Sequence, residues 1–192
     1  QETGRAGRDG LDSYCWLMYS YKDSIRLRKL IDGENQTAGV LKMHISNLLQ
    51  MLAYCENVSV CRRKLLVEHF GEVYDAEACR TSKTPCDVCL QQRKNKDAFK
   101  VYDFTDEAKI VLQSMLQMRN ITTKRLVDLY RGDKTKKTIE AAEKYGHSKQ
   151  AFCGRGAGMS EPDAQRFIHK LVVEEFIEEK LYRLRNVETI IS

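Results

Sequence analysis

The sequence predicts a mainly helical chain that ends in a winged-helix domain with a β-wing. Apolar residues recur at helical spacing in successive segments that begin near Ser, Thr or Asp and stop near glycine. The last of these segments is followed by two strand-like runs, 180–183 and 187–191, around a turn at Arg185 and Asn186. Three of four clustered cysteines lie in residues 72–103, a segment with little periodicity, which indicates a subdomain stabilised by a bound metal ion.

Composition describes a folded chain with no membrane span. Of 192 residues, 42% are hydrophobic and 31% charged, and only two are proline. No stretch approaches about 18 consecutive apolar residues, so we expect no transmembrane helix. The polar first residues exclude a secretory signal peptide, and the missing initiator Met leads us to expect a portion of a longer protein.

The first half of the chain is predicted to contain one strand and three helices. The apolar run 14–19 (YCWLMY) has the length and composition of a buried strand. Asp23 or Ser24 is expected to cap a helix that stops at Gly33. A second helix is expected over 40–54, and Ser59 is expected to cap a third, which closes at Gly71.

The second half is predicted to contain three helices before the hairpin. One opens at Thr105, one opens at Thr122 or Thr123 and ends at Gly132, and one opens at Ser160 and runs through Phe176. Between the last two lies a polar, basic stretch. Residues 122–155 hold nine Lys or Arg against four acids, which favours a nucleic-acid surface, although a solvated loop and helix face would have the same composition.

The cysteines predict a structural zinc site. Seven cysteines without a secretion signal favour metal ligands over disulfides. Cys86 and Cys89 have C-x-x-C spacing, and Cys61 with Cys79 would complete the four thiolates that zinc prefers. The other candidates are Cys15, Cys55, Cys153 and His69. Four thiolates leave no open coordination position, so the zinc would be structural rather than catalytic.

The string Gln1–Gly10 (QETGRAGRDG) predicts an anion-binding arginine pair. Arg5 and Arg8 are three residues apart, so on a helical turn they face the same way. Gly4 and Gly7 leave room for close approach, and two guanidinium groups suit a triphosphate. A surface salt-bridge pair is the alternative interpretation.

These motifs resemble those of the RecQ helicases. Residues 1–10 look like motif VI of superfamily 2 helicases in its RecQ form, and residues 61–72 (CRRKLLVEHFGE) with Cys79, Cys86 and Cys89 resemble the RecQ zinc-binding subdomain. Tyr54–Asn57 is similar to the Bloom-syndrome-type members. The resemblance implies the end of a second RecA-like lobe at 1–33, a helical-hairpin zinc-binding subdomain at 34–103, and a winged-helix (RQC) domain at 104–192.

The resemblance also implies roles for single residues. Cys61, Cys79, Cys86 and Cys89 match the zinc ligands of the family, Arg8 looks like the arginine finger that reaches the ATP γ-phosphate, and Arg5 looks like its supporting partner. In the winged helix, Lys134 and Lys137 match phosphate contacts, while Arg185 and Asn186 match the tip of a wing that separates strands.

The implied protein is the C-terminal portion of a nuclear, ATP-dependent 3′-5′ DNA helicase that acts in DNA repair, recombination and replication. Its partners would be forked, branched or structured duplex DNA and the other helicase lobes of the same chain, with no membrane, and its cofactors would be structural Zn²⁺ together with ATP and Mg²⁺. This sequence has no Gly-Lys-Ser/Thr phosphate loop and no Asp-Glu-x-His motif, so alone it should not hydrolyse ATP.

Two other functions fit part of the pattern. A zinc-stabilised winged-helix DNA-binding module without a motor would share the cysteines and the wing, but it would have no use for a paired-arginine motif. A winged helix that binds an acidic protein partner would use only the basic stretch.

Overall fold

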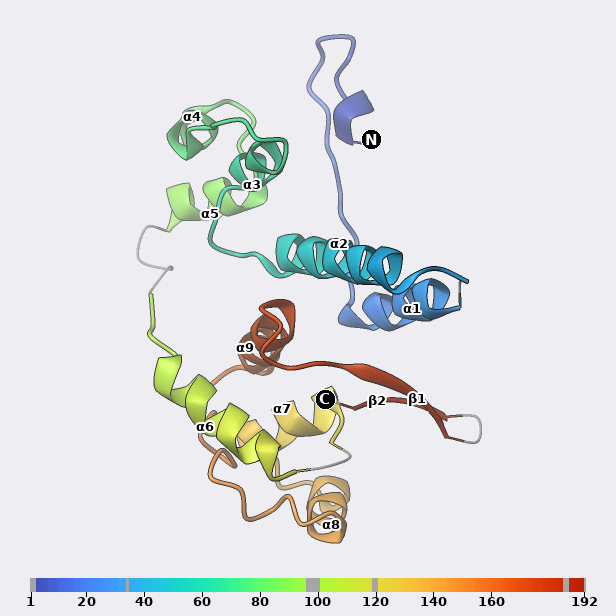
Figure 1. Cartoon of the computed structure of the whole chain (residues 1–192). Helices are drawn as coiled ribbons and strands as arrows, with labels where there is room; N and C mark the ends of the chain where they lie inside the picture. The colour runs from blue at the N-terminus through green and yellow to red at the C-terminus, as the bar shows by residue number, and fades with distance from the viewer. Residues whose placement is uncertain (1–2, 34, 96–100, 119–120, 185–186, 192) are drawn as a thin grey trace. The chain divides into compact units, whose positions relative to one another are not determined.

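The computed structural model describes residues 3–33, 35–95, 101–118, 121–184 and 187–191 (Figure 1). The chain divides into two compact units, one formed by Gln1–Ser24 with Met51–Val101 and the other by Ile25–Gln50 with Tyr102–Ser192. Helices dominate both units, which confirms the mainly helical class. None of the helices in the described ranges combines the length and apolarity that a bilayer crossing requires.

The expected strand at 14–19 does not form. After the short 3₁₀ helix η1 (Thr3–Arg5) the chain has no regular structure up to Ser20, and Trp16 is 85% exposed. A strand needs a neighbour for its backbone hydrogen bonds, and in the described ranges the two strands pair with one another. Tyr19 of this run is anchored, because its hydroxyl donates to Glu56 Oε1 at 2.8 Å. Burial, reinforced by that carboxylate, raises the pKa of Tyr19 and keeps the hydroxyl a donor.

Two helices follow, α1 (Tyr21–Asp32) and α2 (Ala38–Glu56). The predicted cap of α1 was placed too late, since Asp23 lies inside the first turn and its Oδ2 accepts from Ser20 N at 3.1 Å. The stop at Gly33 is confirmed. The second helix forms as expected, and its Leu48 and Leu52 are buried.

Three short helices come next, α3 (Arg62–His69), α4 (Ala76–Thr81) and α5 (Asp87–Lys94). Ser59 does not cap α3, because Asn57 organises the preceding loop instead. Asn57 Oδ1 accepts from the backbone N–H of Ser59 and of Val60. The helix then begins after Cys61, and Gly71 closes it with a φ of 81°.

After Tyr102, the described residues of the second unit form four helices and a β-hairpin. The helices are α6 (Thr105–Leu116), α7 (Thr123–Arg131), α8 (Lys136–Lys144) and α9 (Glu161–Val173). The strands of the hairpin are β1 (Lys180–Leu184) and β2 (Val187–Ile191). The strands pair antiparallel from Lys180 opposite Ile191 to Leu184 opposite Val187, which confirms the hairpin. Thr122 and Ser160 cap their helices as predicted, but α9 ends at Val173 rather than Phe176. The basic stretch between α7 and α9, for which no helix was predicted, contains α8.

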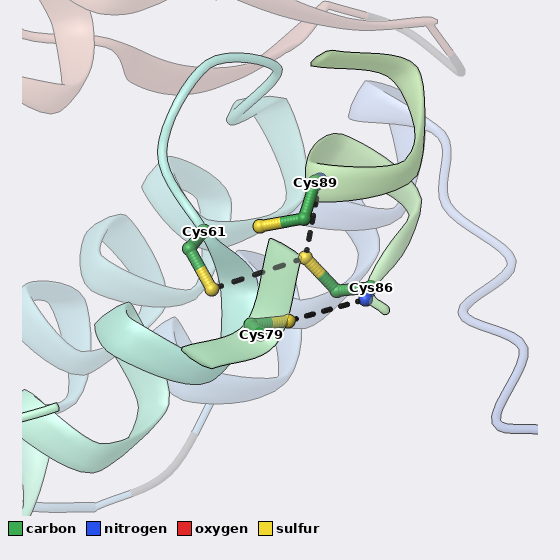
Figure 2. Close-up of side chains that lie close together, drawn as sticks. All are labelled: Cys61, Cys79, Cys86 and Cys89. Atoms are coloured by element: carbon green, nitrogen blue, oxygen red, sulfur yellow. Dashed lines mark hydrogen bonds between the residues drawn. The ribbon is translucent and has the colours of Figure 1, made fainter. Parts of the chain in front are cut away.

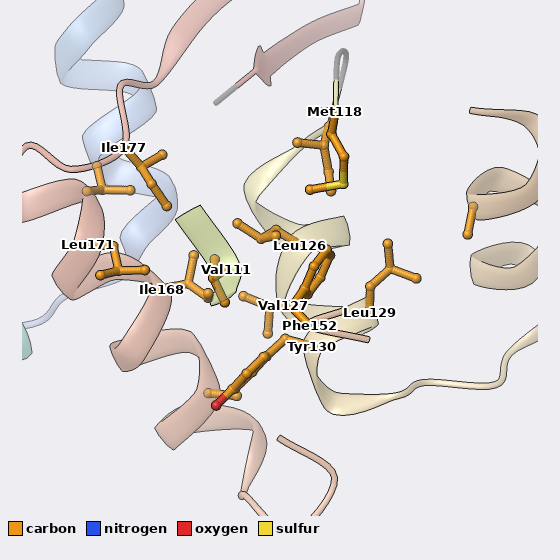
Figure 3. Close-up of a cluster of buried hydrophobic side chains, with 14 residues drawn as sticks. Val111, Met118, Leu126, Val127, Leu129, Tyr130, Phe152, Ile168, Leu171 and Ile177 are labelled. Atoms are coloured by element: carbon orange, nitrogen blue, oxygen red, sulfur yellow. The ribbon is translucent and has the colours of Figure 1, made fainter. Parts of the chain in front are cut away.

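A hydrophobic core holds α6, α7 and α9 together (Figure 3). Its fully buried members come from all three helices and from the segment after α8, and they include Val111, Leu126, Tyr130, Phe152 and Ile168. Ala142 brings α8 into the same core. This packing ties α8, and with it part of the basic stretch, to the same core as α6, α7 and α9.

Glycines let the segment after α8 run against the end of α7. Gly154 N donates to Leu129 O at 2.9 Å, and Gly156 N donates to Tyr130 O at 2.8 Å. A Cβ on Gly156 would lie 2.6 Å from Tyr130 Cδ1, inside van der Waals contact with a buried ring. Only glycine fits there.

We expect Gly156→Ala to lower the free energy of unfolding by about 1–3 kcal/mol, because the Tyr130 ring must move within a packed core. Chemical denaturation of the zinc-loaded chain measures the loss. Gly158→Ala is the matched control, since no atom lies within 4 Å of its Cβ position. Equal stability of the two variants would contradict the packing argument.

Candidate zinc site and nucleic-acid surface

The four predicted cysteines converge on one point (Figure 2). Their Sγ atoms all lie within 4.8 Å of one another, and those of Cys61 and Cys86 are 4.0 Å apart. Cys61, Cys79 and Cys89 are buried, while Cys86 is half-buried. In a tetrahedron with Zn–S bonds of about 2.3 Å the sulfurs are about 3.8 Å apart, so this spacing fits a zinc ion with little adjustment.

Helix ends position the thiols. Cys61 precedes α3 and Cys79 lies on α4, which Asp75 caps by accepting from Glu77 N at 2.9 Å. Cys86 caps α5, where its Sγ accepts from Cys89 N at 3.4 Å. The C-x-x-C motif therefore forms the N-terminus of one helix, α5, which places the sulfurs of Cys86 and Cys89 on the same side.

The rival ligands lie outside this group. Cys15 and His69 are exposed, and Cys55 and Cys153 are half-buried. Within the described ranges, these four cysteines are the group of metal-ligating side chains that lie close enough to bind one ion. Their donor set, four sulfurs with no carboxylate, is the one that suits structural zinc.

The thiols differ in acidity when no metal balances them. Burial raises the pKa of Cys79 and of Cys89, because a thiolate is costly where water is excluded. Burial acts on Cys86 in the same sense and is the largest single effect, but hydrogen bonds from the backbone N–H groups of Cys89 and Arg62 and from the neighbouring thiols together outweigh it and lower the pKa of Cys86. A divalent cation is the partner that would let the buried thiols ionise together.

Arg62 joins the thiol cluster to the end of α2. Its Nε donates to Asp87 Oδ1 at 2.7 Å, its Nη1 to Tyr54 O at 2.8 Å, and its Nη2 to Asn57 O at 3.1 Å. The guanidinium also lies 5.4 Å from the centre of the Tyr54 ring. Burial opposes ionisation of Asp87, but the hydrogen bond and positive charge of Arg62, together with backbone N–H groups at the start of α5, hold the pKa of Asp87 below the ordinary value. We call these contacts of Arg62 with Asp87, Tyr54 and Asn57 the Arg62 clasp, and they were not predicted from the sequence.

We expect Arg62→Ala to lower the free energy of unfolding of the zinc-loaded chain by about 2–3 kcal/mol, because two part-buried carbonyls and one carboxylate lose their donor. Zinc content should stay at the parental value, since no sulfur is removed. Denaturant titration with metal analysis of the same sample separates the two quantities. Arg93→Ala is the control, because Arg93 is exposed and makes one 3.5 Å hydrogen bond to Ser82 O.

The structure leaves the predicted arginine pair open to solvent. Arg5 ends η1 and Arg8 lies beyond it, so the two do not share one helix. Both side chains are exposed, and Arg8 Nε donates only to Gly4 O, at 3.4 Å. Both guanidinium groups are therefore accessible to an anionic ligand, and none of the described residues supplies an anion to them.

The predicted DNA contacts are described only in part. Lys134 is exposed in the turn between α7 and α8. That turn is fixed by Asp133, whose Oδ2 accepts from the hydroxyls of Thr135 (3.1 Å) and Thr138 (3.0 Å). Lys137 lies on α8, but its side chain is outside the described structure, and so are Arg185 and Asn186. Two helices joined by a short turn with Gly132 form a helix-turn-helix.

Two family models match the chain. One, described as RecQ zinc-binding, matches residues 21–90, and the other, described as the RQC domain, matches residues 98–188. The first therefore contains the thiol cluster and the Arg62 clasp, and the second contains α6 to α9, β1 and the first two residues of β2.

Curated relatives agree with the family models. RecQ-like DNA helicase blm-1 of Caenorhabditis elegans is 56% identical over 97% of this chain and 19% of its own length. RecQ-like DNA helicase BLM of Xenopus laevis is 35% identical over 95% of the chain and 14% of its own length. ATP-dependent DNA helicase hus2/rqh1 of Schizosaccharomyces pombe is 34% identical over 94% and 13%. The chain spans less than a fifth of each relative. It belongs to the RecQ family and carries the zinc-binding and RQC domains of that family.

Proposed function

We propose that the chain is the portion of an ATP-dependent DNA helicase that links the motor to duplex DNA. The observation that carries the proposal is the largely buried four-thiol cluster within a matched RecQ zinc-binding region, directly ahead of a matched RQC region. The named helicases among its relatives support the same activity for the intact protein. We assign that protein to the nucleus and to DNA repair and recombination.

Each segment of the chain has its own role. Residues 1–33 end the second RecA-like lobe, residues 34–103 form the zinc-binding subdomain, and residues 104–192 form the winged helix. Cys61, Cys79, Cys86 and Cys89 hold one structural zinc ion, which fixes three short segments at one point. Arg62 then transmits this rigidity to α2.

The arginines serve the motor. Arg8 reaches the γ-phosphate of ATP across the cleft between the helicase lobes, and Arg5 supports it. Their exposure favours this role, because an arginine already bound in a salt bridge could not serve it. The remaining lobes supply the phosphate loop and the carboxylates for Mg²⁺, which this sequence lacks.

The winged helix reads the duplex and opens it. Lys134 and Lys137 contact phosphates from the turn and first turn of α8, where the positive end of the helix dipole adds to their charge. Arg185 and Asn186 form the wing tip that separates strands in a 3′-5′ helicase on forked or branched DNA.

The test of the DNA-binding part is the affinity of the zinc-loaded chain for forked DNA over a salt series, with zinc measured on the same sample. We expect one zinc per chain, and we expect log K to fall linearly with log salt, because Lys and Arg side chains displace counterions from the DNA phosphates. Binding that is absent or insensitive to salt would exclude this function and favour a protein-binding winged helix.

The wing has its own prediction in the intact enzyme. We expect the double variant Arg185→Ala with Asn186→Ala to impair unwinding of forked DNA, while DNA-stimulated ATPase activity stays close to the parental rate. Removal of the tip abolishes the wedge without touching the ATP site. Parallel loss of unwinding and ATPase activity would show that the tip does not act as the wedge.

A further inference from the structure

Two cations share one aromatic ring at the C-terminal end of α8. The Arg125 guanidinium of α7 lies 5.2 Å from the centre of the Tyr145 ring, and Lys144 Nζ lies 5.5 Å from it. We call Arg125, Lys144 and Tyr145 the Tyr145 cluster. It lies at the opposite end of α8 from Lys134.

The backbone fixes the cluster in place. Gly146 N donates to Glu143 O at 3.1 Å, and His147 N donates to Ala142 O at 2.8 Å, with Gly146 at a φ of 72°. This pair of bonds is a Schellman motif, which ends the helix in one defined conformation. His147 is buried and its ring stacks on that of Tyr145, with centroids 5.8 Å apart. The Tyr145 ring is thus a rigid support for both cations.

The charges of the cluster are not balanced by acids. Among the described residues, no carboxylate lies within ion-pair distance of Arg125 or Lys144. Neighbouring cations on the same helices do have such partners: Lys124 lies 3.2 Å from Asp128, and Lys136 lies 3.9 Å from Glu140. A guanidinium fork beside an ammonium group is the combination that binds a phosphate oxygen.

The length of α8 suggests which phosphates these are. From Lys136 to Lys144 the helix rises by about 12 Å, at about 1.5 Å per residue. That is close to the major-groove width of duplex DNA, about 12 Å. Cations at both ends of one helix can therefore reach separate phosphates of the same duplex.

We propose that the Tyr145 cluster is a second DNA-backbone contact of the winged helix, which binds a phosphodiester apart from those that Lys134 and Lys137 bind. The inference rests on the proposed DNA-binding function and adds a contact to it. Tyr145 is the positioning residue, and Arg125 and Lys144 make the contact.

The test uses the zinc-loaded chain and forked DNA in fluorescence anisotropy over a KCl series. We expect Arg125→Ala and Lys144→Gln each to weaken binding about 3–10-fold at about 0.1 M salt and to reduce the slope of log K against log salt by up to about 0.9. Lys124→Ala is the matched control, because this cation is next to Arg125 but paired with Asp128. It should stay within about twofold of the parent.

Variants of Tyr145 distinguish the positioning of the two cations from their charge. Tyr145→Phe keeps the ring and should bind DNA as the parent does, whereas Tyr145→Ala should lose as much affinity as Arg125→Ala. Melting temperatures show whether Arg125→Ala and Tyr145→Ala fold. Lys144→Gln changes only an exposed helix end, so it tests the contact even if those variants unfold.

Two kinds of failure are distinguishable. If the parent binds DNA and Lys144→Gln keeps the parental affinity and salt slope, or if Lys124→Ala is equally weakened, the cluster is not a specific contact. If the parent binds poly-glutamate but not DNA, both the cluster assignment and the DNA-binding function fail, and an acidic protein is the partner.

Discussion

Serine in place of Cys89 is expected to abolish zinc binding and to unfold the segment from Cys61 to Leu90. The apolar cluster around the thiols is small, since its buried members are three of the cysteines, with Tyr74 and Ala76 partly buried beside them. Helices α3, α4 and α5 have eight, six and eight residues, which is shorter than the about 12–15 that an isolated helix needs. Apparent zinc binding free energies of about 10–16 kcal/mol in small modules exceed what such a core can replace.

Zinc content by metal analysis and helicity by far-ultraviolet circular dichroism check this result. A strong chelator added to the parent should produce the same loss of helix as Cys89→Ser. Cys153→Ser is the matched control, because Cys153 is a half-buried cysteine outside the cluster and should leave one zinc per chain. A Cys89→Ser variant that keeps one zinc and the parental helicity would mean that another residue, such as Cys55, is the ligand.

The same site should bind zinc more tightly as the pH rises. Burial raises the pKa of Cys79 and Cys89, so these thiols carry protons at neutral pH when no metal is present. Zinc displaces those protons, and each displaced proton makes the apparent affinity rise about tenfold per pH unit below the thiol pKa. The dependence therefore has a positive sign and should exceed tenfold per unit around neutrality.

The elements that the sequence predicted well are those that local chemistry specifies. Thr122 and Gly132 bracket α7, because a hydroxyl cap and a left-handed glycine act within a few residues of the chain. The capping pattern at Ser160 and the antiparallel hairpin are local in the same sense. The convergence of the four thiols was also foreseeable, because ligand chemistry restricts which residue types can gather around one ion.

The sequence-based predictions were wrong or incomplete where the local structure depends on residues far away in the sequence. The run 14–19 has strand composition, but a strand forms only beside another strand. Helix α8 was missed because its core contact depends on one small residue, Ala142, and its start on the Asp133 network, neither of which produces an apolar stripe. The Arg62 clasp joins residues 25 positions apart, although an arginine directly after Cys61 and an aspartate directly after Cys86 were a visible signal.

Alanine in place of Arg8 is expected to leave ATP binding by the intact helicase nearly unchanged and to reduce turnover by about 10³–10⁵-fold. An arginine finger acts on the charge that develops as the γ-phosphate is transferred, so it stabilises the transition state more than the bound nucleotide. The exposed Arg8 guanidinium, held only by the carbonyl of Gly4, would lose little stability on removal, so a folding defect is not expected to mimic the effect.

Nucleotide affinity and steady-state ATPase rate with saturating DNA must be measured on the same preparation, because the finger predicts a change in kcat with little change in nucleotide Kd. Arg26→Ala is the matched control, since Arg26 is an exposed arginine on α1 that should leave both quantities at parental values. Arg5→Ala should fall between the two, because a supporting cation positions the finger without reaching the phosphate. If Arg8→Ala turns over ATP at the parental rate, the paired arginines are a surface feature, and the motor takes its finger from another part of the protein.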